Sequence, residues 1–331
     1  MARTKRLIRS FFRLFLPVVV LLVVGVIAAS VWFVHTSSNP PKSAYLLTPE
    51  KYGRLSTRGA KVTDEKWSNR DSTEARGWLL RGNQNAPAVV LLHRYGADRS
   101  HVLNLGVKLN EVTNFTILMP DMRGHGENPP VQMTTFGGHE SEDVLSALDF
   151  LRSLKTDDKN ILVGKNIGVY GVEMGALAGL SAAAKDENVK AMVLDSAPLM
   201  SDDVLASVIG KRFPFASSVT SKMAQLGTYP YYYAGGYNHE SLCGSAANTA
   251  NRQILLLAGV DAPQYQNSTL KLQSCFPSQT GIETNTNLAP SGYSLINASL
   301  EQSEAYDQRV IGFFKQSLGY VEPQVAVVAP Q

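Results

Sequence analysis

The stretch IGVYGVEMGALAG, residues 167–179, places a carboxylate at a turn that could carry out chemistry. Its β-branched start predicts a strand, and the small residues that follow predict a closely packed helix. Between them stands Glu173, with Gly171 and Gly175 two positions away on either side. In a Gly-x-nucleophile-x-Gly turn, the glycines let the strand and the helix pack closely while the strained central residue presents its side chain. A carboxylate there could attack a substrate carbon as a nucleophile.

Three other stretches combine apolar strand residues with polar residues in a turn. They are VVLLHRYGADRS at residues 89–100, MPDMRGHGEN at 119–128 and ILLLAGVDAP at 254–263. Together with the Gly-x-Glu-x-Gly turn, they make residues 61–319 resemble the α/β-hydrolase fold, in particular its lysophospholipase and serine-aminopeptidase branch. They correspond to that branch's His-Gly loop, its Asp-x-Arg-Gly-His-Gly loop and its acid-bearing strand. The resemblance implies a doubly wound, mostly parallel sheet with a small helical cap.

The resemblance also implies a catalytic triad, and the sequence departs from it at all three residues, most clearly at the serine and the histidine. The family's serine corresponds to Glu173, which is one methylene longer than the aspartate nucleophiles that other branches of this fold use. The family's histidine would lie between the last strand and the terminal helix. No histidine follows residue 239, and Tyr293 or a near neighbour takes that place. Tyrosine is a poor general base near neutral pH, so a glutamyl ester on Glu173 would lack a partner that activates water.

The loop that would bind the oxyanion is altered as well. By resemblance, the oxyanion donors would be the backbone N–H groups of Tyr95 and Met174. Arg94 replaces the glycine of the His-Gly loop beside them. Burial of a carboxylate costs free energy unless the charge is paired, and Arg94 on the neighbouring loop offers an opposite charge. We therefore expect an ion pair between Arg94 and Glu173 that fills the former active site.

The third residue of the triad is displaced. The branch places its aspartate three residues after the glycine of the acid-bearing strand, where this chain has Ala262, and Asp261 lies one residue early. These departures predict a degenerate triad and a pseudoenzyme that serves as a binding or scaffolding module. The alternative is an active hydrolase of esters or amides that uses Glu173 with an unusual base. Fold-level analogy alone would favour that alternative.

Composition restricts the partners. The chain has 331 residues with 44% hydrophobic content, enough for one large α/β core or two smaller ones. Five of its 31 Lys and Arg residues precede the first apolar run, which leaves the rest of the chain slightly acidic. A nucleic-acid surface is not expected on such a domain. The expected partner is an unidentified small ligand or protein, and no cofactor is expected.

Residues 14–34, LFLPVVVLLVVGVIAASVWFV, are uncharged and long enough to cross a bilayer as a helix. A cleavable signal peptide is the alternative, because IAAS resembles a cleavage site, but the apolar run continues to Val34 and favours an uncleaved anchor. Basic residues precede the helix and HTSSNPP follows it. The distribution of basic residues predicts a cytoplasmic amino terminus and an extracytoplasmic folded domain.

The predicted organisation is a basic cytoplasmic segment, a membrane anchor, a linker, one α/β-hydrolase-like domain and a flexible tail. Within the domain, an irregular stretch with short helical pieces predicts a cap over the active-site edge of the sheet. The expected boundaries are 1–13, 14–34, 35–60, 61–320 and 321–331, with the cap at 199–252.

Apolar strands alternate with helices through most of the domain, which indicates a parallel sheet covered on both faces. Before this alternation, KVTDEKWS and TEARGWLLRG predict a hairpin with its turn at residues 69–72. At the other end, SLEQSEAYDQRVIGFFKQSLG predicts a terminal amphipathic helix. Ser299 and Gln302 form its expected capping box, and Gly319 its expected stop.

Two cysteines, Cys243 and Cys275, are the only thiols in the chain. An even number in an oxidising compartment favours one disulfide, and two buried free thiols are the alternative. Their spacing matches neither a metal-ligand set nor a CxxC redox pair.

Other polar residues have structural explanations. His93 and His125 could act as bases or as metal ligands beside Glu173, but by resemblance they support loop structure, and no metal site is expected. Acidic residues near the start of a predicted helix, Glu140 among them, complement its dipole. The tyrosines of residues 229–233 line a ligand cleft or pack the cap on the sheet.

Overall fold

The computed structural model describes residues 2–42, 44–52 and 59–319. The expected tail at 321–331 and part of the expected linker, residues 53–58, lie outside the described residues. In the expected basic segment, only the side chain of Arg13 is described.

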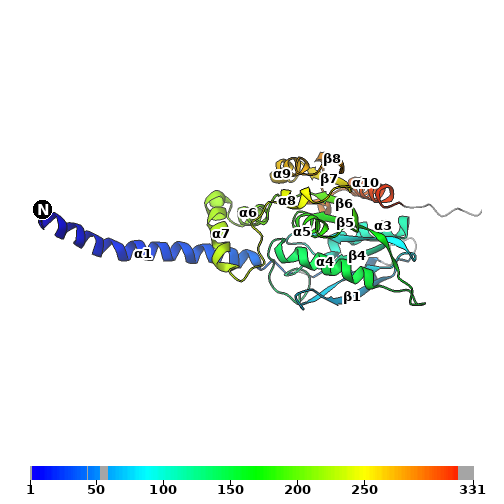
Figure 1. The fold of residues 1–331 in the computed structure, drawn as a ribbon, viewed down its shortest axis with the longest axis horizontal. Coiled ribbons are helices and arrows are strands. Elements are labelled where there is room, and N and C mark those ends of the chain that lie inside the picture. Colours follow the sequence, from blue (N-terminus) through cyan, green and yellow to red (C-terminus); the bar gives the residue numbers. More distant parts are fainter. Residues whose placement is uncertain (1, 43, 53–58, 320–331) are drawn as a thin grey trace, which may run out of the picture.

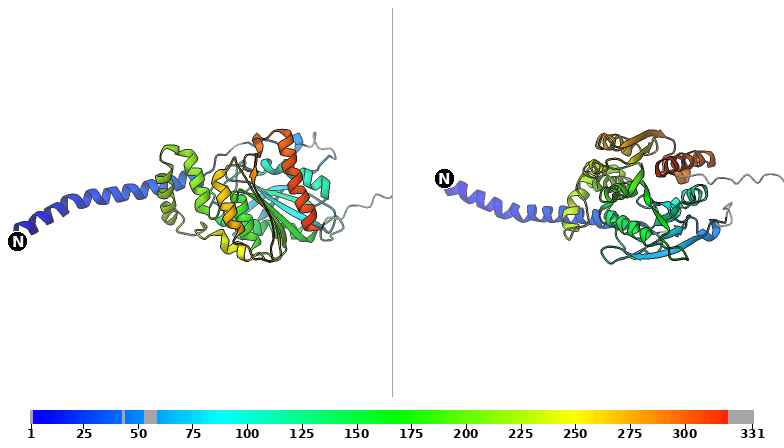
Figure 2. Two further views of the ribbon diagram at one scale, coloured as in Figure 1. Left: turned by 90° about the horizontal axis from the view of Figure 1, so that it is seen from above. Right: turned by 45° about the vertical axis from the view of Figure 1, so that its right-hand side comes forward.

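Eight strands form a single sheet that is parallel except at its first strands (Figure 2). The order across the sheet is β1-β2-β4-β3-β5-β6-β7-β8. β1 and β2 form the expected antiparallel hairpin, β2 pairs antiparallel with β4, and the remaining pairs are parallel. The strands are β1 (Val62–Ser68), β2 (Glu74–Leu80), β3 (Ala86–Leu92), β4 (Thr116–Pro120), β5 (Val163–Val172), β6 (Val189–Asp195), β7 (Gln253–Gly259) and β8 (Gly281–Leu288).

Helices cover both faces of this sheet. α3 and α10 lie on one face, and α4 and α5 lie on the other. The doubly wound α/β architecture is therefore confirmed. The helices outside the cap are α2 (Pro49–Tyr52), η1 (Arg99–Val102), α3 (Leu103–Thr113), α4 (Gly138–Ser153), α5 (Met174–Ala183), α9 (Pro263–Gln273), η3 (Leu295–Asn297) and α10 (Leu300–Leu318).

The central strands are buried on both faces because successive side chains point to opposite sides of the sheet. Along β3, Val89 and Leu91 pack with α3 and α10, while Val90 and Leu92 pack with α4 and α5. All four are fully buried. A continuous apolar run is the pattern expected of such a strand.

The terminal helix has the caps that the sequence predicts. The Ser299 hydroxyl accepts a hydrogen bond from the Gln302 N–H at 3.2 Å, and the Gln302 side chain accepts one from the Ser299 N–H at 3.0 Å. Gly319 ends α10 in the left-handed conformation, at φ 75°. These reciprocal bonds use N–H groups that have no partner within the helix.

The sequence pattern did not indicate two elements, β8 and α9. β8, GIETNTNL, is rich in polar residues and has a half-buried pattern because it is the edge strand and pairs with β7 alone. α9, PQYQNSTLKLQ, carries few apolar residues. Neither segment shows the apolar periodicity that identifies a buried strand or an amphipathic helix.

The segment between β6 and β7 folds as helices at one end of the domain, where a cap was expected. They are α6 (Ser201–Arg212), η2 (Pro214–Ala216), α7 (Ser217–Tyr231) and α8 (Leu242–Ala247). α7 lies beside the end of the long amino-terminal helix α1 (Ala2–Ser38), which extends away from the domain (Figure 1).

α1 continues four residues beyond the predicted end of the anchor, into the segment that was expected to be a linker. Val34 is fully buried in the same core cluster as Val204 of α6, so the end of the anchor is packed into the domain. The last carbonyls of α1 have partners outside the helix. Arg212 donates a hydrogen bond to the Thr36 carbonyl at 3.0 Å, and the Tyr95 hydroxyl donates one to the Ser37 carbonyl at 2.7 Å. Such bonds satisfy groups that a free helix end leaves to water.

The stretch Phe15–Ser38 of α1 is long and apolar enough to cross a membrane, by length and composition. The side chains from Phe15 to Ala28 are exposed. An exposed apolar surface of this size on a helix suits lipid rather than water.

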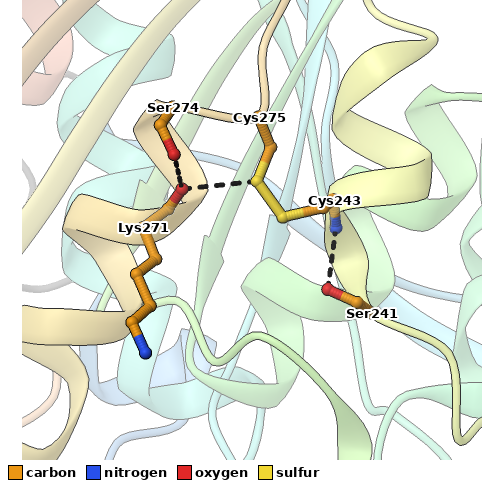
Figure 3. Close-up of a disulfide and its surroundings, with 5 residues drawn as sticks. All are labelled: Ser241, Cys243, Lys271, Ser274 and Cys275. Carbon is orange, nitrogen blue, oxygen red and sulfur yellow. Dashed lines mark hydrogen bonds between the residues drawn. A yellow bond between two sulfur atoms is a disulfide. The ribbon is translucent and has the colours of Figure 1, made fainter.

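The predicted disulfide is confirmed. It joins Cys243 of α8 to Cys275, which lies just after α9, with their Cα atoms 5.0 Å apart (Figure 3). The bond links the cap to the layer of helices beside the sheet.

Candidate active site

Glu173 occupies the strained turn between β5 and α5 that the sequence predicts. Its φ of 51° and ψ of −109° are costly for a residue with a side chain. A Cβ added at Gly171 would overlap the backbone of Gly175, and one at Gly175 would overlap the carbonyls of Leu92 and His93. The two glycines are therefore required by the close approach of β5, α5 and the loop after β3.

The Glu173 carboxylate is 2% exposed and hydrogen-bonded through both oxygens. Oε1 accepts a bond from the Tyr265 hydroxyl at 2.7 Å, and Oε2 accepts one from the Tyr95 N–H at 2.9 Å. Burial raises the pKa of Glu173, while the Tyr265 hydroxyl, the Arg94 charge and the Tyr95 N–H lower it in part. The pKa remains above its ordinary value because desolvation is the largest of these effects.

The hydrogen bond from Tyr95 has a direct chemical consequence. The Tyr95 N–H is one of the two groups that the resemblance identifies as oxyanion donors, and it is already occupied by Glu173. A substrate carbonyl needs such a donor to stabilise the charge that develops on its oxygen. The carboxylate therefore occupies the donor that the resemblance assigns to the oxyanion. The other expected donor, Met174, is buried at the first position of α5.

The predicted ion pair between Arg94 and Glu173 is wrong as a direct contact. The Arg94 guanidinium donates a hydrogen bond to the Tyr95 carbonyl at 2.9 Å and lies over the Tyr293 ring, 5.1 Å from its centre. Among the described residues, no ion pair joins Arg94 to Glu173. The neutral donors of Tyr95 and Tyr265 hold the carboxylate instead. Arg94 still lowers the Glu173 pKa through space, and both side chains line one cavity.

Tyr293, expected near the histidine position, lies at this site but is unsuited to act as a base. Its ring packs against that of Tyr265 with 5.6 Å between centres, and its hydroxyl contacts the Lys211 ammonium. Burial, followed by the charge of Glu173, raises the pKa of Tyr293 to about 12. At neutral pH the phenol therefore keeps its proton and can donate a hydrogen bond rather than accept a proton.

Within the described residues, Asp261 shows no hydrogen bond to a histidine. Its carboxylate accepts hydrogen bonds from the Ser291 N–H and the Ser291 hydroxyl, both at 3.0 Å. Asp195, at the end of β6, accepts bonds from the Gly292 N–H at 2.8 Å and from the Tyr306 hydroxyl at 2.7 Å. Both acids thus hold the loop in which the family's histidine would lie.

The sequence patterns did not indicate three residues of this site, which are Asp195, Tyr265 and Lys211. Asp195 ends an apolar strand, a pattern that could have identified it. Tyr265 comes from α9 and Lys211 from the cap, and neither belongs to a motif. Only the tertiary fold brings them to Glu173 and Tyr293.

His93 supports the loop structure, as expected. Its Nδ1 lies 2.8 Å from the Arg94 carbonyl, so it must be the protonated nitrogen, and its Nε2 accepts a bond from the Met122 N–H at 3.0 Å. Both nitrogens are thus used by the backbone. Burial lowers the pKa of His93 to about 4, which leaves the ring neutral at neutral pH.

His125 is also buried and donates through Nδ1 to the Arg123 carbonyl at 2.9 Å. Its ring packs edge-on against the Tyr95 ring, with 5.3 Å between centres. Burial is the main cause that lowers the pKa of His125 to about 3. The ring fixes the loop that carries Tyr95 and shows no hydrogen bond to Glu173.

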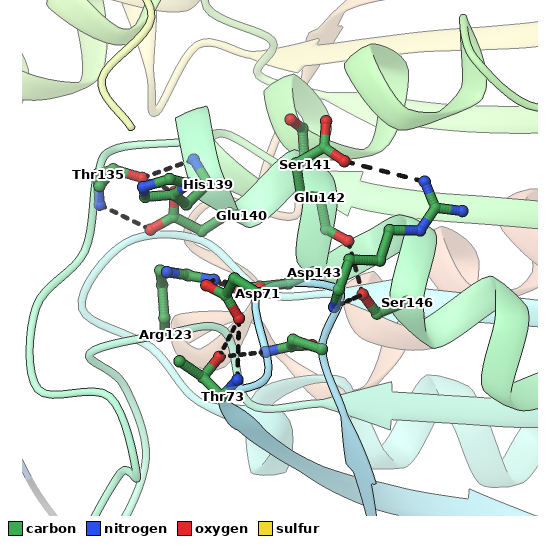
Figure 4. A network of polar contacts seen from close by, with 12 residues as sticks. Asp71, Thr73, Arg123, Thr135, His139, Glu140, Ser141, Glu142, Asp143 and Ser146 are labelled. Atoms are coloured by element: carbon green, nitrogen blue, oxygen red, sulfur yellow. Dashed lines mark hydrogen bonds and ion pairs between the residues drawn. The ribbon is translucent and has the colours of Figure 1, made fainter. Parts of the chain in front are cut away.

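Glu140 stabilises the start of α4, as the sequence predicts, and Asp143 follows it on the same helix (Figure 4). Glu140 accepts hydrogen bonds from the N–H groups of Thr135 and Gly137 at 2.8 and 2.9 Å. Asp143 pairs with Arg123, which also reaches Asp71 at 3.0 Å. These carboxylates are occupied by structural partners. In the described part of the chain, no group of three or more His, Cys, Asp or Glu residues could hold a metal ion.

Two cavities meet at Arg94 and Tyr293, which line both. One, of about 710 Å³, lies among the end of α1, the loop of Tyr95, Glu173 and α6. The other, of about 650 Å³, lies between η1, α3 and the loop before η3. The tyrosines of residues 229–233 are absent from the lining of both cavities, so they do not form a ligand cleft there. The hydroxyl of Tyr231 instead forms a hydrogen bond with the hydroxyl of Ser38, with 2.9 Å between the oxygens.

Comparisons with known proteins agree with this architecture. A family model described as the alpha/beta hydrolase fold matches residues 87–218. The esterase Pf2001 of Pyrococcus furiosus is similar in structure, with a TM-score of 0.60 at 19% identity, and covers 86% of this chain and 99% of its own. The dienelactone hydrolase of Anabaena variabilis has a TM-score of 0.52 at 15% identity, over 78% of this chain and 99% of its own. The chain therefore has the α/β-hydrolase fold.

Sequence relatives match over shorter stretches. The thiohydrolase aneE of Aspergillus aculeatus is 26% identical over 160 residues, which cover 46% of this chain and 48% of the relative. An uncharacterized 31.7 kDa protein of Escherichia coli, from the traX-finO intergenic region, is 26% identical over 133 residues, 40% of this chain and 44% of its own. The chain thus matches less than half the length of these curated relatives.

Proposed function

We propose that this protein is a membrane-anchored pseudoenzyme that binds a ligand and does not hydrolyse it. The observation that carries the proposal is the position of the Glu173 carboxylate, which accepts the hydrogen bond of the expected oxyanion donor Tyr95. The same side chain cannot be both the nucleophile and the occupant of the oxyanion position. The alternative of an active ester or amide hydrolase requires Glu173 to leave that position.

The two phenols that face Glu173 support the same conclusion, because they are poor general bases. Tyr265 and Tyr293 face the carboxylate, and both have pKa values raised by burial, so they remain protonated. Hydrolysis of an acyl or alkyl intermediate on a carboxylate needs a group that removes a proton from water. Neither phenol provides one at neutral pH.

A binding role is available because the fold leaves a cavity beside Glu173. Its volume of about 710 Å³ is in the range of small-molecule sites. Arg94, Lys211 and Arg212 line it together with the single carboxylate of Glu173. This excess of positive charge favours a small ligand with an acidic group.

The activity experiment uses the full chain in detergent with p-nitrophenyl esters of several chain lengths and with aminoacyl anilides. We expect no turnover above that of the Glu173→Gln variant. Glu240→Gln, at an exposed position of the cap, is the matched control. Turnover that Glu173→Gln abolishes and Glu240→Gln preserves would establish the hydrolase alternative.

The binding experiment follows the melting temperature of the same protein with octanoate and with octylamine. Octanoate should raise the melting temperature, and octylamine should not, because the cavity carries more basic than acidic groups. Lys211→Gln should reduce the rise in melting temperature that octanoate causes. An equal response to both amphiphiles would contradict recognition of an acidic group.

A further inference from the structure

A mismatch in length at the anchor points to a second membrane-binding element. The apolar part of α1 that is exposed on all sides ends at Ala28, because Ser30 is already buried against the domain and beyond it only Trp32 remains exposed among the apolar side chains of the helix. From Phe15 to Ala28 the helix is only about 21 Å long at 1.5 Å per residue. The hydrocarbon core of a bilayer is about 30 Å thick. The free part of the anchor is therefore too short to cross a bilayer unless part of the domain enters the lipid with it.

α7 is the part of the domain that lies beside α1 at this level (Figure 1). A Cβ added at Gly227 of α7 would overlap the Ser30 carbonyl of α1, so the two backbones are in close contact there. Any lipid that surrounds α1 beyond Ser30 must also contact the outer face of α7.

The outer face of α7 carries exposed apolar side chains around one exposed lysine, Lys222, whose ammonium can reach the headgroups while its stem lies along the apolar surface. Val219 is 59% exposed and Leu226 is 65% exposed, and Phe215 of the preceding turn is fully exposed. Residues spaced by three and four positions share one face of a helix, and Val219, Met223 and Leu226 have that spacing. The opposite face, which includes Ala224 and Gly227, is buried against the protein.

Aromatic and basic side chains mark the boundary of this surface. Trp32 and Phe33 of α1 contact the ring of Phe213, with 6.0 and 5.1 Å between centres. Lys211 and Arg212 immediately precede this ring and are exposed. Tryptophan beside basic residues is typical of the level where hydrocarbon meets lipid headgroups.

We propose that the tip of the cap, residues 213–226, inserts into the membrane leaflet nearest the domain and that the lipid bilayer is its partner. The apolar surface of the tip is continuous with that of α1. Insertion of the tip therefore extends the apolar surface of the protein toward the full thickness of the hydrocarbon core. The basic residues of the cap then lie among the headgroups, where they attract anionic lipids. This inference does not depend on whether Glu173 is catalytic.

The test uses the full chain in vesicles of phosphatidylcholine with a minor share of phosphatidylglycerol. Single cysteines are introduced at Phe215 and Val219 and labelled with an environment-sensitive fluorophore, because both native cysteines are held in the disulfide. Ile161, exposed in a loop outside the cap, is the matched soluble control, and Val20 of α1 is the membrane control. Labelling must leave the melting temperature within a few degrees of that of the unlabelled protein.

We expect doxyl lipids to quench the labels at 215 and 219 at least half as strongly as the label at 20, and iodide to quench them several-fold less than the label at 161. Quenching of these labels by iodide alone, as at 161, would overturn the proposal. Protection from both quenchers would also overturn it, since a protein surface would then cover the tip.

Discussion

At the scale of single residues, the central feature is a carboxylate held by two neutral donors in a buried turn. The raised pKa of Glu173 means that the folded state binds its proton more tightly than the unfolded state does. The contribution of this group to the free energy of unfolding therefore falls as the pH rises from the unfolded pKa, near 4.5, to the raised folded value.

Glu173→Gln should remove this contribution to the pH dependence. Relative to the variant, the native chain should lose free energy of unfolding with rising pH in that window, by at most about 1.4 kcal/mol per pH unit. Urea unfolding of both proteins at several pH values measures the difference. Other buried acids, such as Asp195, are present in both proteins, so their contributions to the pH dependence cancel in the difference. A difference that stays constant with pH would mean that Glu173 has the same pKa in the folded and unfolded states.

Tyr265→Phe should lower the free energy of unfolding by about 1–3 kcal/mol at neutral pH, because it leaves a buried carboxylate oxygen without its donor. Tyr233→Phe, at a tyrosine that is 87% exposed, should change it little. In the Glu173→Gln background the loss should be smaller, since the charge that requires the donor is gone. Equal losses in both backgrounds would show that the hydroxyl stabilises the fold independently of Glu173.

At the scale of elements, the contact between α1 and α7 depends on a glycine. An added methyl group at Gly227 would overlap the Ser30 carbonyl, whereas one at Gly312 of α10 would meet no atom within 4 Å. The same substitution in two helices should therefore have opposite effects.

Gly312→Ala should raise the free energy of unfolding by about 0.5–1 kcal/mol, because alanine loses less backbone entropy in a helix. Gly227→Ala should lower it by about 1–3 kcal/mol through the clash with α1. Urea unfolding measures both, and limited proteolysis should show faster cleavage of the cap in Gly227→Ala alone. Stabilisation by Gly227→Ala would indicate that α7 is not held against α1 in solution.

The elements differ in how far their sequences determine them. The strand of Val89 to Leu92 was predictable because it is apolar on both faces, and α10 because its caps are local. β8 and α9 have no such pattern, since both lie at the edge of the sheet, where β8 pairs with β7 alone and α9 packs over these two strands. Gly171 and Gly175 were predictable as well, because the close packing of the strand and the helix at this turn requires glycine. The partners of Glu173 did not, because Tyr265 lies 92 residues away and Arg94 turns toward its own loop.

At the scale of the whole molecule, the long helix α1 and the site are joined through one residue, Tyr95. The Tyr95 hydroxyl binds the last turn of α1 at Ser37, and its backbone N–H binds Glu173. The cavity beside Glu173 is also lined by His35 and Thr36 of α1. The helix that is long and apolar enough to cross a membrane is thus part of the wall of the proposed ligand site.

This arrangement predicts that α1 is retained in the mature protein with its amino terminus in the cytoplasm. Cleavage after IAAS would remove Ser30 and the rest of α1 before it, while Val34 and Ser37 would lose the helix that holds them in the core. The intact mass of the protein isolated from membranes should therefore correspond to a chain that contains residues 14–34. In sealed cells, an epitope at residue 161 should be accessible from outside and one at the amino terminus only after permeabilisation, because basic residues precede the anchor. A mass that lacks residues 14–34 would contradict the retention of α1 and its place in the lining of the cavity. An amino terminus that is accessible in sealed cells would contradict the predicted topology.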